Sequence, residues 1–300
     1  MKSKIASIIA VIILIILAIL GQYFYNKPEI DINEDLLRVY YFDVGQADCT
    51  LIINNGKTML IDGGNEADGT RIAKYIGELG IKRLDYIIVT HADSDHMAGL
   101  DKIIDSMITI GTVYMPYTNT DSKETKELVN SVHNKGKDIE TPKINHSFEL
   151  GKAEVVIKSI RDGRKIGDNK SSIVIEMQYG TKKFLFMGDY EELSNNDKNK
   201  YPEEYNEIIW DKVDVLKVAH HGSKTNTMQD FLDKVKPSIA IISAGNNQKY
   251  THPDLEVIDM LKQIGAKTYI TKQDGTILIK SDGYTIFEPE FKRLNLDGNK

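Results

Sequence analysis

The feature that most constrains this chain is a charged segment that directly follows a run of apolar residues. The run, LDYIIVT (84–90), is continuous and predicts a buried strand. The next six residues include four side chains that can bind a metal ion: His91, Asp93, Asp95 and His96. Carboxylates and imidazoles this close together repel one another or compete for protons unless they share a cation. The segment therefore predicts a divalent metal ion at a strand end. The alternative is a polar loop in which Asp93 or Asp95 caps a helix that begins at Met97.

Three later segments end apolar runs in a similar way. Asp189 ends FLFMGD, His220 and His221 end VLKVAHH, and His252 lies in KYTHP. Each has an ordinary explanation by itself: a turn aspartate, a capping histidine, or a loop histidine before proline. Because five of the seven histidines fall in these segments and in HADSDH, we expect the segments to converge on a metal centre.

Between these segments the chain alternates between expected strands and helices. Strands are expected at 38–45, 49–53, 58–62, 84–90, 112–115, 153–160, 171–180, 182–189, 213–220, 238–245, 267–271 and 276–280, and helices at 70–80, 99–107, 122–136, 227–235 and 254–264. Asn55-Gly56 predicts a hairpin turn, and Ser122 predicts a helix cap. Two β-rich halves with interspersed helices predict an α/β fold, with two sheets, helices outside, and a site along their shared edge.

The N-terminal segment predicts a membrane anchor. Residues 5–25 carry no charge and are long enough to cross a bilayer. Lys2 and Lys4 precede the segment and acidic residues follow it, which predicts a cytoplasmic N-terminus and an extracytoplasmic domain in a single-pass protein of the cell membrane. The alternative is a cleaved signal peptide and a secreted domain. We therefore expect a cytoplasmic tail at 1–4, an anchor at 5–25, a linker at 26–36, a hydrolase domain at 37–285 and a tail at 286–300.

Charge and cysteine content limit what the domain can bind. The net charge is −6, so the chain does not attract nucleic acid by bulk electrostatics, and the single cysteine, Cys49, excludes an intramolecular disulfide. The clearest basic cluster is the loop RDGRKIGDNK (161–170), in which Arg164 and Lys165 could guide a phosphodiester, unless the loop is simply solvated. After His221, Ser223 and Lys224 could receive an anionic group; the alternative for Ser223 is a turn or capping residue.

Seven motifs in order resemble one known family. They are DVGQAD, LIDGG, THADSDHMAGL, NKSSIVI, LFMGD, VLKVAHHGS and SAGNNQKYTHP, and they span Arg38 to Lys280. The set is similar to the metallo-β-lactamase superfamily and, more narrowly, to the extracytoplasmic hydrolase domain of the ComEC competence (DNA-uptake) family. The resemblance implies an αββα sandwich with metal at the sheet edges. The family form DVGQGD has Ala47 here, and the channel of the uptake proteins has no counterpart, so we expect a stand-alone relative without a transport role.

The resemblance also implies two metal positions of unequal strength. The superfamily pattern HxHxDH has an aspartate, Asp93, in its second histidine position, and the region that supplies a third histidine is GDNKSS here. The first position would have His91 and Asp93, with Asn169 and Ser172 as candidate substrate contacts. The second would have Asp95, His96, a bridging Asp189, and either His220 or His252. Ligands richer in oxygen favour Mn²⁺ over Zn²⁺, so we expect one firm site and a weaker second for either ion.

The expected function is that of a membrane-anchored, metal-dependent phosphodiesterase or nuclease that uses metal-activated water. Asp95 would orient the water, and His221 or His252 would protonate the leaving oxygen or contact the substrate charge. The alternatives are a hydrolase of another envelope ester (a phosphocholine or teichoic-acid phosphodiester), of a lactam or of a thioester, and a non-catalytic envelope-binding protein. The expected partners are the membrane and a phosphodiester such as DNA, with no protein partner predicted.

Overall fold

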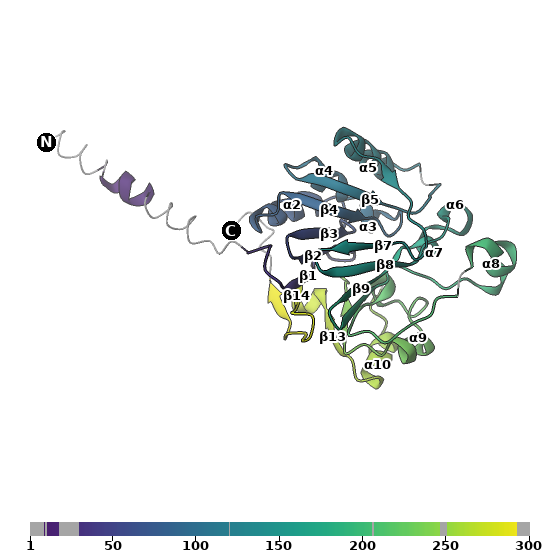
Figure 1. Cartoon of the computed structure of the whole chain (residues 1–300). Coiled ribbons are helices and arrows are strands. Elements are labelled where there is room, and N and C mark those ends of the chain that lie inside the picture. Colours follow the sequence, from purple (N-terminus) through teal and green to yellow (C-terminus); the bar gives the residue numbers. More distant parts are fainter. Residues whose placement is uncertain are drawn as a thin grey trace. The chain divides into compact units, whose positions relative to one another are not determined.

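A computed structural model describes residues 9, 11–17, 30–119, 121–205, 207–246 and 251–292, and is shown in Figure 1. The chain divides into two units, Met1–Asp31 and Ile32–Lys300. In the first unit the described residues 11–17 are helical. The predicted anchor at 5–25 falls largely outside the described residues, and among those that are described we find no helix with the length and apolar character needed to span a bilayer.

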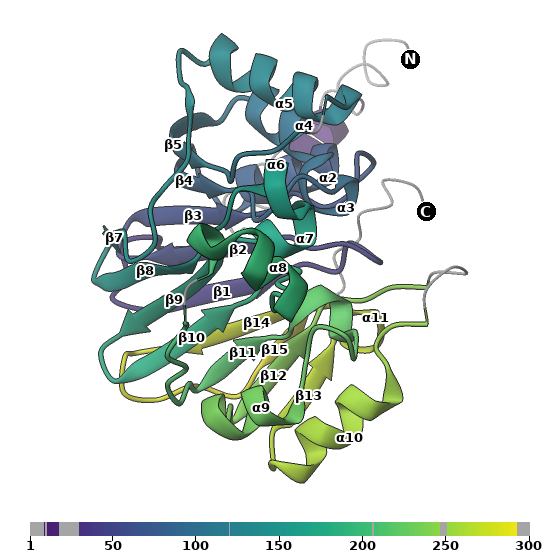
Figure 2. The ribbon, with the colours of Figure 1, turned by 90° about the vertical axis from the view of Figure 1, so that its right-hand side faces the viewer.

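The described residues of the second unit form two sheets (Figures 1 and 2). The first, eight-stranded sheet has the spatial order β15 (Glu290–Lys292), β14 (Thr276–Ser281), β1 (Leu37–Tyr41), β2 (Thr50–Asn54), β3 (Lys57–Ile61), β4 (Arg83–Ile88), β5 (Thr109–Tyr114) and β6 (Ile139–Glu140). The second, seven-stranded sheet has the order β13 (Lys267–Ile270), β12 (Ile239–Ile242), β11 (Val215–Lys217), β10 (Lys182–Phe186), β9 (Val174–Tyr179), β8 (Ala153–Ser159) and β7 (Ser147–Leu150).

The two sheets pack face to face over one apolar core. Alternate side chains of β1 point to opposite faces, as strand geometry requires. Tyr41 stacks on Phe186 of the second sheet with ring centroids 6.2 Å apart, whereas Tyr40 and Phe42 meet Tyr75 edge-on on the outer face. Buried residues of both sheets belong to the same cluster, so this interface is the centre of the domain.

Helices cover the outer faces of both sheets (Figure 1). Over the first sheet these include α2 (Gly69–Glu78), α4 (Leu100–Asp105) and α5 (Lys123–Asn134), and over the second α9 (Gln229–Val235) and α10 (Leu255–Gln263). The shorter helices are α3 (Ser94–Met97), α6 (Gly163–Ile166), α7 (Asp168–Ser171), α8 (Asn195–Lys200), α11 (Thr271–Asp274), η1 (Pro202–Glu204) and η2 (Ala219–Gly222). The fold is therefore the predicted αββα sandwich.

Parallel pairing brings the motif segments to one edge of each sheet. β3 and β4 are parallel, with Ile61 opposite Ile88, so Asp62 and His91 leave the first sheet at the same end. β10, β11 and β12 are also parallel, so the segments that carry Asp189, His221 and Ser243 follow three neighbouring strand ends of the second sheet. Side chains that follow parallel strands meet at the carboxyl edge, which is where α/β proteins place their ligands.

Local predictions from sequence largely hold, and the differences lie in short elements. Ser122 caps α5 by accepting a hydrogen bond from the Thr125 amide at 3.1 Å, and Asn55-Gly56 forms the hairpin turn with φ values of 46° and 76°. The first sheet continues beyond residue 285, where a tail was expected, because β15 pairs with β14. β15 has three residues and β6 has two, too few to give an apolar alternation that a sequence pattern could reveal.

A close backbone approach joins two of the motif loops. Gly245 donates its amide to Gln46 Oε1 at 3.2 Å, and a Cβ added at Gly245 would lie 2.3 Å from the Gln46 nitrogen and 2.3 Å from the carbonyl carbon of Gly45. Only glycine fits there, and the contact brings the loop that carries Asp48 against the loop that carries Ser243.

We therefore expect Gly245→Ala to lower the free energy of unfolding by about 1–3 kcal/mol, because two backbones must separate. The matched control is Gly77→Ala in α2, where an added Cβ meets nothing within 4 Å and a gain of about 0.5–1 kcal/mol is expected. Urea denaturation of both variants measures the difference, and equal stabilities would contradict the packing described here.

Candidate metal centre

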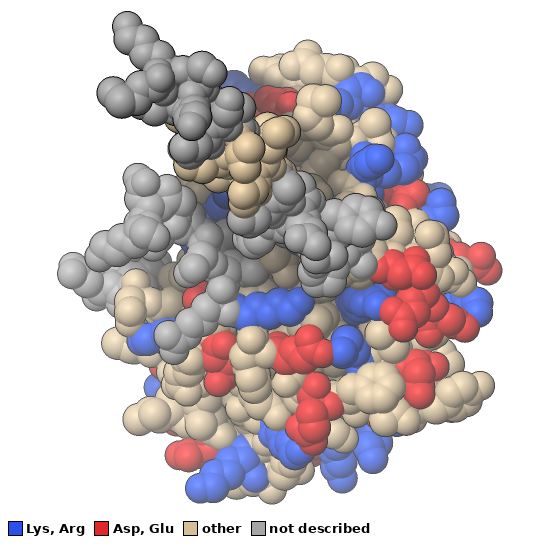
Figure 3. Space-filling view, turned by 90° about the vertical axis from the view of Figure 1, so that its left-hand side faces the viewer, with Lys and Arg blue, Asp and Glu red and all other residues tan. Residues whose placement is uncertain are grey.

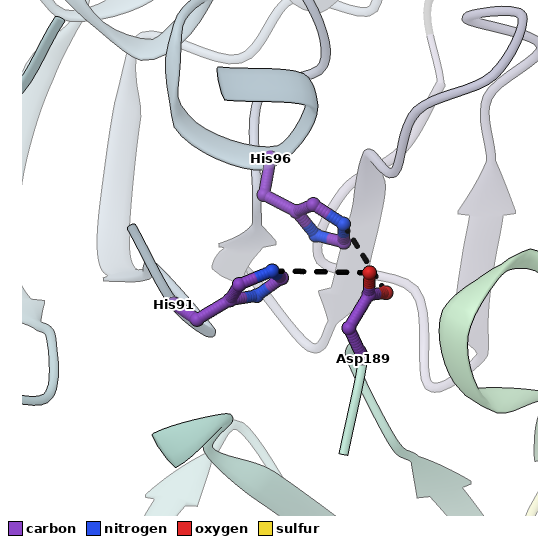
Figure 4. Close-up of side chains that lie close together, drawn as sticks. All are labelled: His91, His96 and Asp189. Atoms are coloured by element: carbon purple, nitrogen blue, oxygen red, sulfur yellow. Dashed lines mark ion pairs between the residues drawn. The ribbon is translucent and has the colours of Figure 1, made fainter. Parts of the chain in front are cut away.

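Three buried side chains from both sheets point toward one another (Figure 4). His91 follows β4, His96 lies in α3, and Asp189 follows β10. His96 Nε2 lies 3.2 Å from Asp189 Oδ1, His91 Nε2 lies 3.8 Å from Asp189 Oδ2, and the two imidazole centroids are 4.1 Å apart. Both histidines are fully buried, and Asp189 is nearly so.

The atoms that converge here lack hydrogen-bond partners. His91 Nε2, His96 Nε2 and Asp189 Oδ1 are buried, and none of them makes a hydrogen bond to a described residue. A buried polar atom without a partner costs free energy, and three together are explained by a cation that accepts their lone pairs. Two imidazole nitrogens and a carboxylate are suitable ligands for Zn²⁺ or Mn²⁺, so the residues present fit a divalent metal ion.

A hydrogen-bond network centred on Asp62 fixes how the two imidazoles face this position. Asp62 accepts hydrogen bonds from the Thr90 amide at 2.8 Å, the Thr90 hydroxyl at 2.7 Å and His96 Nδ1 at 2.9 Å. Because the Thr90 hydroxyl gives its hydrogen to Asp62, it can only accept from His91 Nδ1, 3.0 Å away. Both imidazoles therefore carry hydrogen on Nδ1, so in the neutral form that binds a metal ion the Nε2 lone pair of each faces Asp189.

A second group lies beside the first and shares His96 with it. Asp95, His96 and His221 could hold an ion together. His221 Nε2 lies 3.3 Å from Asp95 Oδ2 and 4.0 Å from Asp189 Oδ2, and its Nδ1 lies 3.0 Å from the Ser243 carbonyl oxygen, which fixes the ring. His221 is buried, whereas the Asp95 side chain is 32% exposed, so this position opens toward solvent.

The other predicted ligands lie around the margin. His220 Nε2 is 3.5 Å from Asp189 Oδ2, and Asp93 Oδ2 is 3.6 Å from His91 Nε2. His252 lies farther out, with its ring centroid 5.7 Å from that of His220. The sequence did not decide whether His220 or His252 is a metal ligand; of the two, His220 is the one in contact with Asp189. His91, which was assigned to the weaker position, lies in the group around Asp189, and His221, expected to act on substrate, lies among the candidate ligands.

A buried ion pair lies behind His221. Lys217 Nζ donates to Asp48 Oδ2 at 2.6 Å, and Asp48 Oδ1 lies 3.4 Å from His221 Nδ1. Asp48, Lys217, Asp62, Thr90 and Ser243 were not predicted as site residues. The sequence contained features that could have predicted them. Asp62 and Asp48 end the motifs LIDGG and DVGQAD near strand ends, and a lysine inside the apolar run VLKVA requires a buried partner.

Charge interactions shift the ionisation of the central groups. Burial opposes ionisation of Asp189, but His96, His221 and His91 outweigh burial and hold its pKa well below the usual range. Burial likewise disfavours the charged form of His221, yet Asp189, Asp48 and Asp95 raise its pKa to about 10. The same balance, with Asp189 and Asp62 as the anions, raises the pKa of His96 well above its ordinary value.

The candidate substrate contacts lie at different depths. Asn169 Nδ2 is 3.4 Å from His220 Nδ1, and Ser172 is buried with its hydroxyl accepting the Asp189 amide at 3.3 Å. Ser223 is also buried, and its hydroxyl contacts the amide and hydroxyl of Thr225, as a turn residue does. Lys224 is exposed and pairs with Glu256 at 3.2 Å.

The basic loop at 161–170 is largely neutralised. Arg164 binds Asp162 through both carboxylate oxygens at 2.8 and 2.6 Å. Lys165 pairs with Glu203 at 3.0 Å and with Glu204 at 2.8 Å. Cations that are already paired attract a phosphate weakly, so this loop gives little support to the predicted role of Arg164 and Lys165.

Comparison with known proteins agrees with this architecture. The family model described as Metallo-beta-lactamase superfamily matches residues 42–246. ComE operon protein 3 of Bacillus subtilis is 31% identical over 199 residues, which are 66% of this chain and 25% of that protein, so the chain spans about a quarter of this relative's length. Ribonuclease Z of Clostridium botulinum is 26% identical over 82% of this chain and 78% of that enzyme. The crystal structure of the metallo-beta-lactamase fold protein YhfI from Bacillus subtilis superimposes with a TM-score of 0.53 and 11% identity, covering 83% of this chain and 100% of that one.

Replacing Asp62 tests the orienting network. In Asp62→Asn the amide group can no longer accept all three hydrogen bonds, so the Nε2 lone pairs of His91 and His96 are no longer fixed. We expect the affinity for Zn²⁺ or Mn²⁺ to fall by about 10–100-fold, as measured by competition with a chelating dye. The control is Asp138→Asn. The Asp138 side chain is 89% exposed, so this variant should bind the metal ion with the affinity of the wild type. Equal affinities in both variants would rule out an orienting role for Asp62.

Metal binding should also compete with protons. A metal ion needs neutral imidazoles, but the pKa of His221 is raised to about 10 and that of His96 is raised as well, which favours their protonated forms in the metal-free protein. We expect affinity to rise between about pH 6 and pH 9, with about one to two protons released per ion. Calorimetry in buffers of different ionisation enthalpy counts the protons, and no release at pH 7 would contradict the arrangement.

The stability of the metal-free protein should fall as the pH rises, whereas its affinity for metal should increase. A pKa that is raised in the folded state stabilises the fold fully below the ordinary value of 6.5, and this contribution is lost as the pH rises toward about 10. Thermal unfolding of the metal-free protein, with chelator present and at a series of pH values, measures this loss of stability and checks the calorimetry independently.

Proposed function

The chain belongs to the metallo-β-lactamase superfamily and resembles the competence-type members, and we propose that it is a metal-dependent hydrolase that cleaves a phosphodiester. One observation carries the proposal. Three buried atoms, His91 Nε2, His96 Nε2 and Asp189 Oδ1, converge without hydrogen-bond partners among the described residues. A site built only for stability would have paired these atoms.

Some of these residues would bind the metal ion, and others orient the imidazoles that bind it. His91, His96 and Asp189 would hold the ion, and Asp62 and Thr90 keep the two imidazoles facing it. When bound, a divalent ion supplies a water molecule that can lose its proton near neutral pH. Asp95, partly exposed beside this group, can accept a hydrogen bond from that water or from substrate. We propose Zn²⁺ or Mn²⁺ at this position and a weaker second position at Asp95 and His221.

His252 is the candidate for proton transfer at the margin. Its side chain is 14% exposed, and burial lowers its pKa below the ordinary value, which favours the neutral imidazole. A neutral imidazole can accept a proton during attack and return it to the leaving oxygen. His221 is less suited to this role because it is enclosed by Asp48, Asp95 and the Ser243 carbonyl.

Two classes of phosphodiester remain as substrates. The name of the relative ribonuclease Z supports a nuclease. The charge distribution favours the second class, a small envelope phosphodiester, because Arg164 and Lys165 are paired and the chain carries a net charge of −6. A polynucleotide needs a continuous basic surface more than a single phosphodiester does. On the face drawn in Figure 3, which is opposite to the one that Figure 2 shows with α6, α7 and α8, basic and acidic side chains are intermixed.

We also propose that the protein is anchored to the membrane with its hydrolase domain outside. The uncharged segment at 5–25, with lysines before it and acidic residues after it, supports this location. Protease added to intact cells should digest the domain; protection from the protease would contradict the proposal.

Removal of the central carboxylate tests the proposed function. Protein stripped with a chelator is reloaded with Mn²⁺ or Zn²⁺ and assayed on bis(p-nitrophenyl) phosphate, single- and double-stranded DNA, and a cephalosporin. In Asp189→Asn we expect hydrolysis of every substrate that the wild type cleaves to fall by more than about 100-fold, because a ligand itself is lost. The control is Asp121→Asn, whose side chain is 84% exposed and should leave the rate unchanged.

The pattern of substrates then distinguishes the alternatives. DNA cleavage that weakens steeply with added salt supports a nuclease, whereas turnover of the aryl diester without DNA cleavage supports an envelope ester. Cleavage of the cephalosporin alone contradicts the phosphodiester assignment. Full activity in Asp189→Asn contradicts the site itself.

A further inference from the structure

Next to the metal centre lies a pocket of about 320 Å³ that is lined by both aromatic and charged side chains. Its rings belong to Tyr190, Tyr205, Trp210 and Phe231. The Trp210 ring meets the rings of Tyr190 and Phe231 edge-on, with centroids 6.0 and 5.0 Å away. Tyr190 is buried, whereas Tyr205 is 39% exposed. Edge-to-face packing fixes the inner rings, so the pocket presents a preformed aromatic surface to a small group.

Asn226 connects the pocket to the metal centre. It lines the pocket, donates from Nδ2 to the carbonyl oxygens of Asp189 at 3.0 Å and Tyr190 at 3.1 Å, and places Oδ1 3.0 Å from His220 Nδ1. Tyr190 also follows Asp189 directly in the chain. One side chain therefore contacts the pocket wall, the backbone of Asp189 and the His220 imidazole, which itself lies 3.5 Å from the Asp189 carboxylate, so the pocket adjoins the metal centre.

One ammonium group of the chain itself, that of Lys198, already lies in this pocket. Its charged lining residues are Glu192, Glu207, Asp230, Lys198 and Lys234. Lys198 Nζ lies 4.5 Å from the centroid of the Tyr205 ring and 3.2 Å from Glu192. An ammonium over an aromatic face with a carboxylate beside it is the arrangement by which proteins bind alkylammonium ligands.

We propose that this pocket binds an alkylammonium group of the substrate, which makes the substrate a zwitterionic phosphodiester. The inference rests on the proposed function, because the phosphate of the same molecule goes to the metal centre. The negative phosphate of such a substrate would be attracted to the metal ion, and its positive ammonium group to the carboxylates of the pocket. A polynucleotide would instead bring further phosphates toward Glu207 and Asp230, neither of which forms an ion pair with a described residue. Lys198 competes with the ligand for the Tyr205 ring and for Glu192.

The chain provides its own reporter for a binding test. Trp210 is the only tryptophan in the sequence, so the fluorescence of the full chain reports on this pocket without any catalysis. Titration with choline should give a saturable change with a dissociation constant in roughly the millimolar range. The matched control is 3,3-dimethylbutanol, which has the shape of choline without the charge and should bind at least about tenfold more weakly.

Two outcomes of the titration overturn the proposal. One is equal binding of choline and of the uncharged analogue, which would reduce the pocket to an apolar site. The other is tighter binding of a nucleoside monophosphate than of choline, which would make it a base-stacking site.

Substitutions of Tyr205 and Lys198 test whether choline binds at this aromatic ring. Tyr205→Leu should weaken choline binding by about fivefold or more, and Tyr205→Phe should retain it because the aromatic face is kept. Lys198→Gln should strengthen binding, because the competing ammonium is removed. Both tyrosine variants keep Trp210, so the same measurement serves throughout. Unchanged affinity in Tyr205→Leu together with unchanged affinity in Lys198→Gln would contradict the proposal.

Hydrolysis separates this inference from the proposed function. The wild type, loaded with Mn²⁺ or Zn²⁺, is assayed on p-nitrophenyl phosphocholine and on bis(p-nitrophenyl) phosphate. A preference for the choline diester that disappears in Tyr205→Leu supports both proposals. Equal rates on the two diesters in wild type and variant leave the phosphodiesterase intact and overturn the pocket. Choline binding without hydrolysis of either diester supports the pocket and overturns the enzyme.

Discussion

The site depends on a set of buried nitrogen and oxygen atoms that the described residues leave without hydrogen bonds. His91 and His96 come from the first sheet and Asp189 from the second. The group of His91, His96 and Asp189 draws on both sheets, so the face-to-face packing of the sheets assembles this centre. The apolar interface that contains Tyr41 and Phe186 therefore determines the distance between the imidazoles and the carboxylate as much as the loops do.

Two buried networks hold these groups from behind. Asp62 and Thr90 fix the imidazoles of the first sheet, and the ion pair between Asp48 and Lys217 lies behind His221. Asp48 belongs to a loop of the first sheet and Lys217 to β11 of the second, so their 2.6 Å contact also ties the two sheets together. A buried charge needs a partner, and here Asp62 also orients His96 while Asp48 lies 3.4 Å from His221, which couples the stability of the sandwich to the geometry of the centre.

The surroundings of the centre influence which substrate it suits. The loop with Arg164 and Lys165 has its cations paired, and the neighbouring pocket is walled by aromatic rings with carboxylates beside them. A long polyanion is favoured by unpaired cations, whereas a molecule with one phosphate and one cation needs few of them. The local charge pattern thus supports the small phosphodiester proposed above more than a polynucleotide.

The sequence by itself determined the chemical groups and the edge of the fold where they lie. Apolar runs predicted strands, the residues after them predicted ligands, and the ordered motifs predicted the αββα sandwich. Tertiary structure alone decided which groups meet. Asp48 and Lys217 lie 169 positions apart, and Arg164 and Lys165 looked like a basic patch until Asp162, Glu203 and Glu204 were placed beside them. Periodicity reports only whether a residue faces the core or solvent. The partner of a buried charge depends on how two sheets dock, and that docking leaves no local pattern in the chain.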